Sequence, residues 1–252
     1  MLEVRGVSKS FSGVMAVDGV SAAVRRGEVV GLIGPNGAGK TTLFNLIAGN
    51  LRPTAGQIVL NGKPIENTPP HSRIRLGLGR TFQIPRPFSG MTVLENVVFA
   101  AQHQIGERIA PNWFLPHRVA ADERRNVEKA KSLLELVTLG SHAREPARIL
   151  SGGQRKLLEL ARILMADPEI ILLDEPAAGV NPALLEIVIA KIAEINGQGV
   201  TFLIIEHNMD LVSRLCARVL VMASGRIMRE GAPAEVSRDP RVIEAFLGGV
   251  AA

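Results

Sequence analysis

The sequence predicts an α/β protein with a mainly parallel sheet and a helical insertion, and three patterns in its 252 residues support this. An apolar run, a glycine-rich loop and a helical stretch follow one another over residues 28–49. From residue 169 onward, short β-rich runs alternate with helical stretches, as in βαβ units. Between residues 92 and 165 the pattern is helical. We therefore expect a single domain over residues 1–252, with a core of about 1–83 and 166–252 and a helical subdomain of about 84–165.

Short strands joined by turns dominate the opening third of the chain. Strand-like runs occur at LEVRGV, VSAAVR, EVVGLI and GQIVLNGKPI. The last contains the pair Asn61–Gly62, which is typical of hairpin turns. We expect the N-terminal strands to pair antiparallel and the β-branched run EVVGLI (28–33) to be a buried strand.

The glycine-rich loop after this strand has the composition of a phosphate-binding site. Its residues GPNGAGKT (34–41) fit the pattern G-x-x-x-x-G-K-[ST] of a P-loop. The glycines let backbone N–H groups turn toward an anion at the positive end of the next helix, Lys40 reaches the outer phosphates, and Thr41 can ligate Mg²⁺. An ordinary strand-to-helix connection is the alternative. The nucleotide contacts that we expect are Gly34, Pro35, Asn36, Gly37, Ala38, Gly39, Lys40, Thr41 and Thr42.

Two helices are predicted between residues 92 and 140 of the insertion. The stretch TVLENVVFAAQHQ begins with Thr92 and has Glu95 three residues later, which is a capping box. The stretch ADERRNVEKAKSLLELVTLG is helical, and Gly140 is its expected end. Pro111 and Pro116 lie between the two, so a loop or a broken helix is expected there.

Carboxylates end one apolar strand, and a carboxylate and a histidine end another. The run IILLDEP finishes with Asp174 and Glu175, and ligands gather at the carboxyl ends of parallel strands. Asp174 can hold Mg²⁺, and Glu175 can take the proton from an attacking water. Capping of the following helix by this pair is the alternative. The run VTFLIIEH ends in Glu206 and His207, whose imidazole can sense or orient the γ-phosphate.

The turn LSGGQ precedes an apolar helical stripe and is a second candidate anion site. Ser151, Gly152 and Gly153 stand where a helix begins, with a hydroxyl and exposed N–H groups. Plain N-capping by Ser151 is the alternative. Two phosphate-type sites in separate subdomains suggest that two chains clamp one nucleotide.

GPNGAGKT, LSGGQ, IILLDEP and His207 together resemble the ATP-binding subunits of ABC transporters, in the family's order and across essentially the whole chain. The resemblance implies a head-to-tail dimer in which ATP lies between the P-loop of one subunit and the turn of the other. It assigns Gln83 in GRTFQ to contact with Mg²⁺, and it places Phe11 against adenine. The residues AAGVNP, Ala177 to Pro182, take the place of the D-loop. The turn residues expected to contact the partner's ATP are Ser151, Gly152, Gly153 and Gln154.

Finer features resemble the ATPases of branched-chain amino acid importers, namely GRTFQIPRPFSGMTVLENV, LLELAR, DEPAAGVNP and LIIEHNMDLV. The nearest alternatives are the ATPases of urea importers and of lipopolysaccharide exporters. Asn181 and Asn208 stand where many family members have Asp. The resemblance implies an ATP hydrolase that drives solute uptake through two separate permease subunits and works indirectly with a periplasmic or extracellular solute-binding protein.

Charge and composition weigh against other classes. The net charge of +5 suits an anionic partner, but the basic residues are dispersed and lack interleaved aromatics, so no nucleic-acid partner is expected. A non-transport ABC ATPase would need long coiled coils or a second nucleotide domain, and neither is present in the sequence. In a P-loop kinase the LSGGQ motif would have no function.

No apolar run has the length of a membrane span, and the N-terminus lacks a signal-peptide pattern. We expect a peripheral protein on the cytoplasmic side of the inner membrane, with Cys216 in the core.

Overall fold

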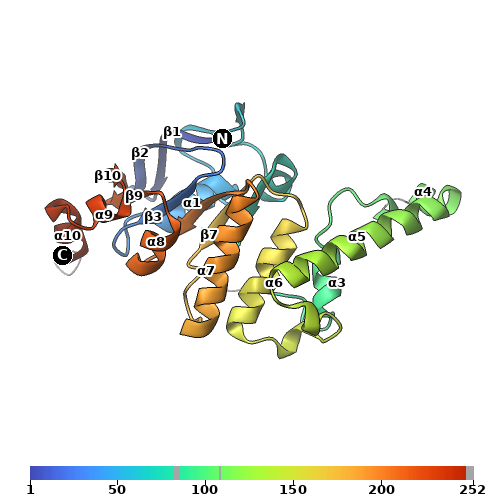
Figure 1. The fold of residues 1–252 in the computed structure, drawn as a ribbon. Coiled ribbons are helices and arrows are strands. Elements are labelled where there is room, and N and C mark those ends of the chain that lie inside the picture. Colours follow the sequence, from blue (N-terminus) through green and yellow to red (C-terminus); the bar gives the residue numbers. More distant parts are fainter. Residues whose placement is uncertain (82–85, 108, 248–252) are drawn as a thin grey trace. The chain divides into compact units, whose positions relative to one another are not determined.

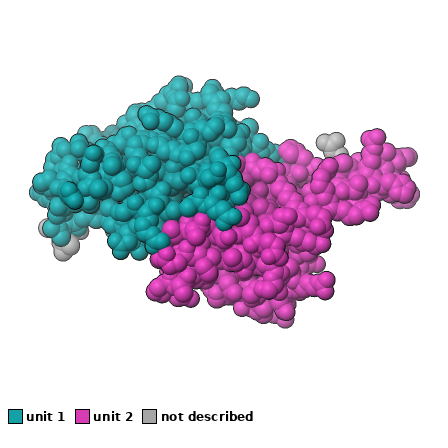
Figure 2. Space-filling view, in the orientation of Figure 1, with its two compact units in different colours: residues 1–80, 169–178, 192–252 teal, residues 81–168, 179–191 magenta. Residues whose placement is uncertain are grey.

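The computed structural model describes residues 1–81, 86–107 and 109–247, whose helices and strands are shown in Figure 1. The chain divides into two compact units (Figure 2). Unit 1 comprises residues 1–80, 169–178 and 192–252, and unit 2 comprises residues 81–168 and 179–191. The stretch 179–191, which our sequence boundaries place in the core, belongs to unit 2.

Unit 1 contains the predicted mainly parallel sheet. Its six strands follow the order β10-β9-β3-β8-β7-β6, and only the β10–β9 pair is antiparallel. All residues of the strands β3, β7 and β8 are buried, because elements cover both faces, and this explains their unbroken apolar runs. The strands are β3 (Val29–Ile33), β6 (Leu78–Arg80), β7 (Ile170–Asp174), β8 (Thr201–Ile205), β9 (Arg218–Ala223) and β10 (Arg226–Gly231).

The N-terminal strands form a second, antiparallel sheet, as predicted. Its order is β2-β1-β4-β5, with β1 (Leu2–Phe11), β2 (Val14–Val24), β4 (Ala55–Leu60) and β5 (Lys63–Pro64). The hairpin between β4 and β5 turns at Asn61 and Gly62, which have φ values of +50° and +77°. Both are left-handed, which is why an Asn-Gly pair stands there.

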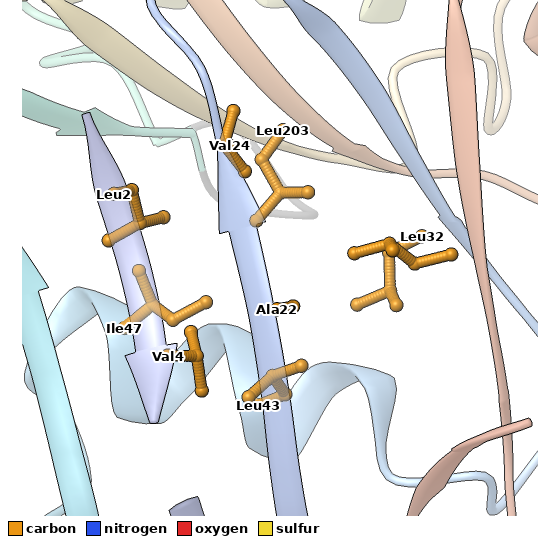
Figure 3. A pocket seen from close by; sticks show the side chains of 9 residues that line it. Leu2, Val4, Ala22, Val24, Leu32, Leu43, Ile47 and Leu203 are labelled. Carbon is orange, nitrogen blue, oxygen red and sulfur yellow. The ribbon is translucent and has the colours of Figure 1, made fainter. Parts of the chain in front are cut away.

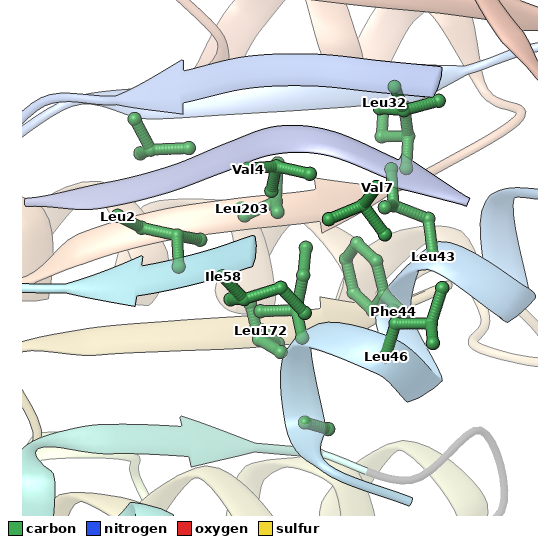
Figure 4. Close-up of a cluster of buried hydrophobic side chains, with 14 of the residues drawn as sticks. Leu2, Val4, Val7, Leu32, Leu43, Phe44, Leu46, Ile58, Leu172 and Leu203 are labelled. Atoms are coloured by element: carbon green, nitrogen blue, oxygen red, sulfur yellow. The ribbon is translucent and has the colours of Figure 1, made fainter. Parts of the chain in front are cut away.

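The helix α1 (Lys40–Ala48) packs its apolar side chains against strands of both sheets. Figure 4 shows Leu43, Phe44 and Leu46 among side chains of β1, β4, β7 and β8. The cavity that remains there (Figure 3) is lined by apolar residues and has a volume of only about 10 Å³. A space this small and apolar holds neither water nor a ligand, so this region is core rather than a binding site.

A buried arginine fastens the far end of α1. Arg73 closes the short helix α2 (Pro70–Arg73) and donates to the carbonyls of Leu46, Thr68 and Ile65 at 2.9, 2.9 and 2.6 Å, and also to that of Ile47. Burial lowers the pKa of Arg73 to about 10. A cation at the carboxyl end of α1 stabilises the helix dipole and satisfies its terminal carbonyls.

Three helices complete unit 1 after β8. They are α8 (Met209–Leu215), α9 (Pro233–Val236) and α10 (Pro240–Leu247). Cys216 follows α8 and is buried, as the sequence predicts, and burial raises the pKa of its thiol to about 12. Within the described part of the chain, no helix combines the length and the apolar character that crossing a membrane requires.

Unit 2 is helical. It contains α3 (Val93–Val98), α4 (Ile109–Phe114), α5 (Pro116–Leu136) and α6 (Gly152–Leu164), and α7 (Pro182–Gly197) begins in it. The predicted capping box is confirmed, because Glu95 N donates to Thr92 Oγ1 at 3.1 Å and Thr92 N donates to Glu95 Oε2 at 2.7 Å. The expected break between helices occurs at Leu115, between α4 and α5.

The helix α4 lies at one end of α5 (Figure 1) and presents apolar side chains to solvent. Asn112 on its polar side donates to the Gly106 carbonyl at 2.7 Å. Ile109, Trp113 and Phe114 are each at least 80% exposed. This is the reverse of an ordinary surface helix, whose apolar stripe faces the core.

Candidate functional site

The loop between β3 and α1 has a backbone that glycine alone accommodates. Gly34, Gly37 and Gly39 have φ values of +151°, +77° and +97°. A Cβ atom on Gly34 would lie 2.0 Å from the Met222 carbonyl oxygen, and one on Gly39 would lie 2.3 Å from that of Ala16. These contacts are impossible for other residues. The pattern G-x-x-x-x-G-K is therefore a requirement of the local geometry.

Lys40, the first residue of α1, is buried and holds this loop in shape. Its Nζ donates to the carbonyls of Gly34 and Pro35 at 2.7 and 2.8 Å. Burial lowers the pKa of Lys40, and the nearby Glu175 carboxylate partly offsets this. Gly39 is the N-cap of α1 and has no side chain that could accept a hydrogen bond from the helix. The first N–H groups of α1 are therefore left for an anion to bind.

A cavity of about 230 Å³ opens over the start of α1. Most of the predicted phosphate contacts line it, together with two side chains that come from the ends of other strands. Gly34 and Pro35 stabilise the loop instead, because their carbonyls accept hydrogen bonds from Lys40 Nζ. The lining residues are Ala16, Asn36, Gly37, Ala38, Gly39, Lys40, Thr41, Thr42, Glu175 and His207.

Glu175 and His207 meet directly at the mouth of this cavity. His207 Nε2 lies 2.9 Å from Glu175 Oε1. Glu175 has a φ of +49°, a left-handed conformation that costs a non-glycine residue about 1–2 kcal/mol. Its N–H donates to the Ile205 carbonyl at 3.0 Å, which holds the strained residue beside β8. The two strand ends at which the sequence places Glu175 and His207 therefore lie side by side, because β7 and β8 pair in parallel.

Asp174 is the last residue of β7 and is buried beside an arginine. Arg80 Nη2 lies 3.3 Å from Asp174 Oδ2. Burial raises the pKa of Asp174, and the charge and hydrogen bond of Arg80 act in the opposite direction. Both Asp174 and Thr41 present oxygen atoms, the donor type that Mg²⁺ prefers.

Glu206 has a positioning role that we did not predict from sequence. Its buried carboxylate accepts hydrogen bonds from the N–H groups of Ala177, His207 and Asn208 at 2.8, 2.8 and 3.1 Å. It therefore ties the segment after β7 to the segment after β8, and so fixes where Glu175 and His207 lie. The sequence signal that was available for Glu206 is its position at the end of an apolar strand. Its hydrogen-bond partners could not be predicted, because they depend on the order of the strands in the sheet.

The turn before α6 is a capping box. Gln154 N donates to Ser151 Oγ at 3.3 Å, and Ser151 N donates to Gln154 Oε1 at 2.9 Å. A Cβ atom on Gly153 would lie 2.1 Å from Leu184 Cδ2, so packing against Leu184 favours this glycine, whereas a Cβ atom on Gly152 would make only an ordinary contact, 3.9 Å from the Gly179 carbonyl oxygen. Within one chain Ser151 is therefore the N-cap of α6, which is the alternative given in the sequence analysis. Contact of this turn with a partner's ATP stays a prediction.

Both asparagines that replace the usual aspartate are helix N-caps. Asn181 Oδ1 accepts from Leu184 N at 2.9 Å, before α7. Asn208 Oδ1 accepts from Asp210 N and Leu211 N at 3.0 and 3.2 Å, at the start of α8. Asn and Asp cap helices about equally well, so these departures preserve the local backbone.

One further predicted site residue lies apart from the cavity lining. Phe11 ends β1 with a partly exposed ring, and Lys9 Nζ lies 5.2 Å from its centroid. Val14 and Met15, which follow it in the chain, are also exposed. These side chains offer an apolar surface of the kind that stacks a base. Gln83 lies outside the residues that the structure describes.

Comparison with known proteins gives full-length matches. Residues 17–178 match the family model "ABC transporter", and residues 230–252 match "Branched-chain amino acid ATP-binding cassette transporter". A probable branched-chain amino acid transport ATP-binding protein LivG of Archaeoglobus fulgidus is 42% identical over 98% of this chain and 95% of its own length. The high-affinity branched-chain amino acid transport ATP-binding protein BraF of Pseudomonas aeruginosa is 40% identical over 98% of both chains.

Solved structures agree with these relatives. A nucleotide-free ATP-binding cassette from an ABC transporter aligns with a TM-score of 0.84 at 38% identity, over 97% of this chain and 98% of the other. An ATP-binding cassette in its ADP conformation aligns with a TM-score of 0.83 at 39% identity, over 98% of both chains. The predicted fold, with its antiparallel N-terminal sheet, mainly parallel sheet and helical insertion, is confirmed by these matches.

Proposed function

Because the chain belongs to the ATP-binding subunits of ABC transporters, in the branched-chain amino acid group, we propose that it hydrolyses ATP to drive uptake of branched-chain amino acids through separate permease subunits. The observation that carries the proposal is the cavity in which the P-loop, Lys40 and the Glu175–His207 pair meet. The match of residues 230–252 favours this substrate class over the urea-importer and lipopolysaccharide-exporter alternatives.

The nucleotide's phosphates occupy the cavity over the start of α1. The backbone N–H groups of the first turn of α1, which have no partner within the helix, bind them, and Lys40 leaves its loop carbonyls to contact the outer phosphates. The adenine stacks on Phe11. Thr41, Asp174 and Gln83 are the residues that would hold Mg²⁺, which neutralises charge on the phosphates when bound.

The donors present fit this cation. Among the described residues no group of three His, Cys, Asp or Glu side chains forms a metal cluster. Mg²⁺ characteristically uses one or two carboxylates and completes its shell with phosphate oxygens and water, so Asp174 and the Thr41 hydroxyl suffice on the protein side.

The pair of Glu175 and His207 at the cavity mouth supplies the groups that we propose for ATP hydrolysis. Glu175 accepts the proton of a water whose oxygen attacks the γ-phosphorus, and the bond to the β–γ bridging oxygen breaks to release ADP. His207, 2.9 Å from Glu175, keeps this carboxylate in place and contacts the γ-phosphate with its imidazole. Glu206 fixes the backbone of both segments.

A second chain completes the site. In a head-to-tail dimer, with itself or a homologous ATPase, Ser151, Gly152, Gly153 and Gln154 of the partner close over the γ-phosphate, and Gly152, which carries no Cβ atom, permits close backbone approach. Two permease subunits receive the movement, and a solute-binding protein delivers the amino acid. The subunit then works peripherally on the cytoplasmic face of the inner membrane.

Uptake by a reconstituted complex tests the proposal. Vesicles that contain the chain, its permeases and a solute-binding protein are expected to take up leucine in the presence of ATP and not urea. Glu175→Gln should abolish this uptake, whereas Glu128→Gln, at an exposed carboxylate on α5, should leave it intact. ATP-driven uptake of urea without leucine would overturn the substrate class.

A further inference from the structure

Arg80 connects the P-loop helix to the end of β7. In the parallel β6–β7 pair Arg80 lies opposite Leu172, so its side chain leaves the sheet on the same face as Leu172 and Asp174. Its Nη2 lies 3.3 Å from Asp174 Oδ2, and its Nη1 donates to Asn45 Oδ1 on α1 at 2.7 Å. One guanidinium thus bridges the helix that begins at Lys40 and the strand that ends at Asp174.

This pair differs from the surface ion pairs of the chain. The side chains of Arg80 and Asp174 are only 12% and 6% exposed, so water screens their charges little. Arg80 Nε is also buried, and among the described residues it has no hydrogen-bond partner. An arginine kept in place with one donor unsatisfied is a costly way to stabilise a fold, which points to a use for its charge.

We propose that Arg80 is a fixed counter-ion that neutralises Asp174 in the nucleotide-free protein, so that the site takes up a divalent cation only together with ATP. The inference rests on the proposed function, in which Asp174 is a Mg²⁺ ligand. A carboxylate that already faces a guanidinium attracts a free cation weakly, and the fixed positive charge repels it. The phosphates of the nucleotide supply the negative charge that overcomes this repulsion. Arg80 is therefore a positioning residue that makes metal binding conditional on nucleotide binding.

Mn²⁺ binding to the nucleotide-free protein tests this directly, because electron paramagnetic resonance counts free Mn²⁺ without any turnover. Arg80→Gln removes the charge but keeps a hydrogen-bond donor, and we expect Mn²⁺ to bind at least about tenfold more tightly than to the wild type. Arg80→Lys is the matched control. It keeps the charge, so its Mn²⁺ affinity should stay close to that of the wild type.

A second variant covers the case in which Arg80→Gln fails to fold, since removing one partner of a buried pair leaves an uncompensated charge. Asn45→Asp leaves both charged residues in place and offers the guanidinium a competing carboxylate at 2.7 Å. We expect it to strengthen Mn²⁺ binding as well. Asn45→Ala, which removes the acceptor without adding charge, should change the Mn²⁺ affinity much less.

Binding of an ATP analogue in EDTA distinguishes failure of this inference from failure of the proposed function. The inference is overturned if a folded Arg80→Gln protein binds the analogue in EDTA like the wild type and shows unchanged Mn²⁺ affinity. It is also overturned if Arg80→Lys strengthens Mn²⁺ binding as much as Arg80→Gln does. Wild-type protein that binds no ATP analogue, with or without Mg²⁺, would instead overturn the proposed function.

Discussion

Glu175 occupies left-handed backbone and still directs its carboxylate at His207 from 2.9 Å away. The conformation is held by the hydrogen bond to the Ile205 carbonyl and by Glu206, which binds the next segment at Ala177. Strain concentrated at one residue of a cavity is typical of a site where position matters more than stability. A side-chain change at Glu175 should therefore alter chemistry while the backbone stays as it is.

Glu175→Gln is expected to keep ATP binding and to lower turnover by about 10²–10⁴-fold, because an amide cannot accept the proton of the attacking water. It should also accumulate an ATP-bound dimer, since the closed state resets only after hydrolysis. ATPase assays and size-exclusion chromatography with ATP measure the two effects. Near-normal hydrolysis would rule out Glu175 as the base.

At the scale of the elements, charged side chains join strands that the chain order separates. Arg218 opens β9 and donates from Nε and Nη2 to the two carboxylate oxygens of Glu28 at 2.8 and 2.9 Å, just before β3. It also pairs with Glu230 on β10. This hydrogen-bonded pairing lowers the pKa of Glu28. Three strands of the main sheet thus share one guanidinium at the end where β3 begins.

Arg218→Gln should lower the free energy of unfolding at pH 7 by about 2–4 kcal/mol, because Glu28 loses its partner in a mostly buried place. A carboxylate with a depressed pKa stabilises the fold above its unfolded pKa and loses this effect as the pH falls. The difference between wild type and variant should therefore shrink below about pH 4. Urea unfolding at both pH values measures it. Arg5→Gln, at an exposed pair with Glu3, should change stability by less than about 1 kcal/mol.

The segment before α3 presents an aromatic pair at the surface of unit 2. Phe88 and Phe99 pack edge to face with ring centroids 4.9 Å apart, and the guanidinium of Arg162 lies over the Phe88 ring at 5.3 Å. Phe88 is 43% exposed, so its ring is not confined to the core of unit 2. Met91 nearby is half-buried. Such a surface suits a short helix from a permease.

Phe88→Ala is expected to leave the isolated subunit folded, with unchanged ATP turnover, and to reduce ATP-driven uptake in vesicles, because we expect Phe88 to make the contact that passes movement to the permease. Phe114→Ala, the same change at an exposed ring on α4, is the matched control for uptake. A fall in melting temperature together with equal losses of turnover and uptake would show that Phe88 is a structural residue.

Local backbone demands were predictable from the sequence, whereas contacts between distant segments were not. The P-loop was predictable because its glycines mark left-handed backbone, which a short sequence pattern signals, as the φ values of +77° and +97° at Gly37 and Gly39 show. The Arg80–Asp174 pair depends on β6 lying beside β7, and the role of Glu206 depends on β7 lying beside β8. Strand neighbours of this kind are set by the packing of the whole sheet. LSGGQ stays ambiguous because the nucleotide contact that we propose for it lies in another molecule.

At the scale of the whole molecule, one chain supplies a phosphate site in unit 1 and a glycine turn in unit 2. Ser151 and Gln154 satisfy each other within the chain, and the N–H groups next to them remain available for a partner's nucleotide. Under the proposed function, assembly and catalysis are linked, because ATP binds one chain first and closes the dimer second.

Ser151→Arg is expected to leave ATP binding to the monomer unchanged and to abolish closure of the dimer, through its bulk and its charge beside Lys40 of the second copy. Mixing it with Lys40→Ala chains should restore some activity, because mixed dimers then hold one intact composite site. Ser132→Arg, on exposed α5, is the control. Full ATPase activity of Ser151→Arg alone would refute a shared site.

Trp113, at the exposed tip formed by α4, is the only tryptophan of the chain, which contains no tyrosine. Ultraviolet emission of this protein therefore comes from a side chain that water already surrounds in the native state. Its spectrum should be red-shifted before denaturation begins, and a soluble quencher such as acrylamide should reach it freely. Unfolding of the sheets in unit 1 would change the emission of Trp113 very little. A molecule that binds to α4 would shift this emission to the blue.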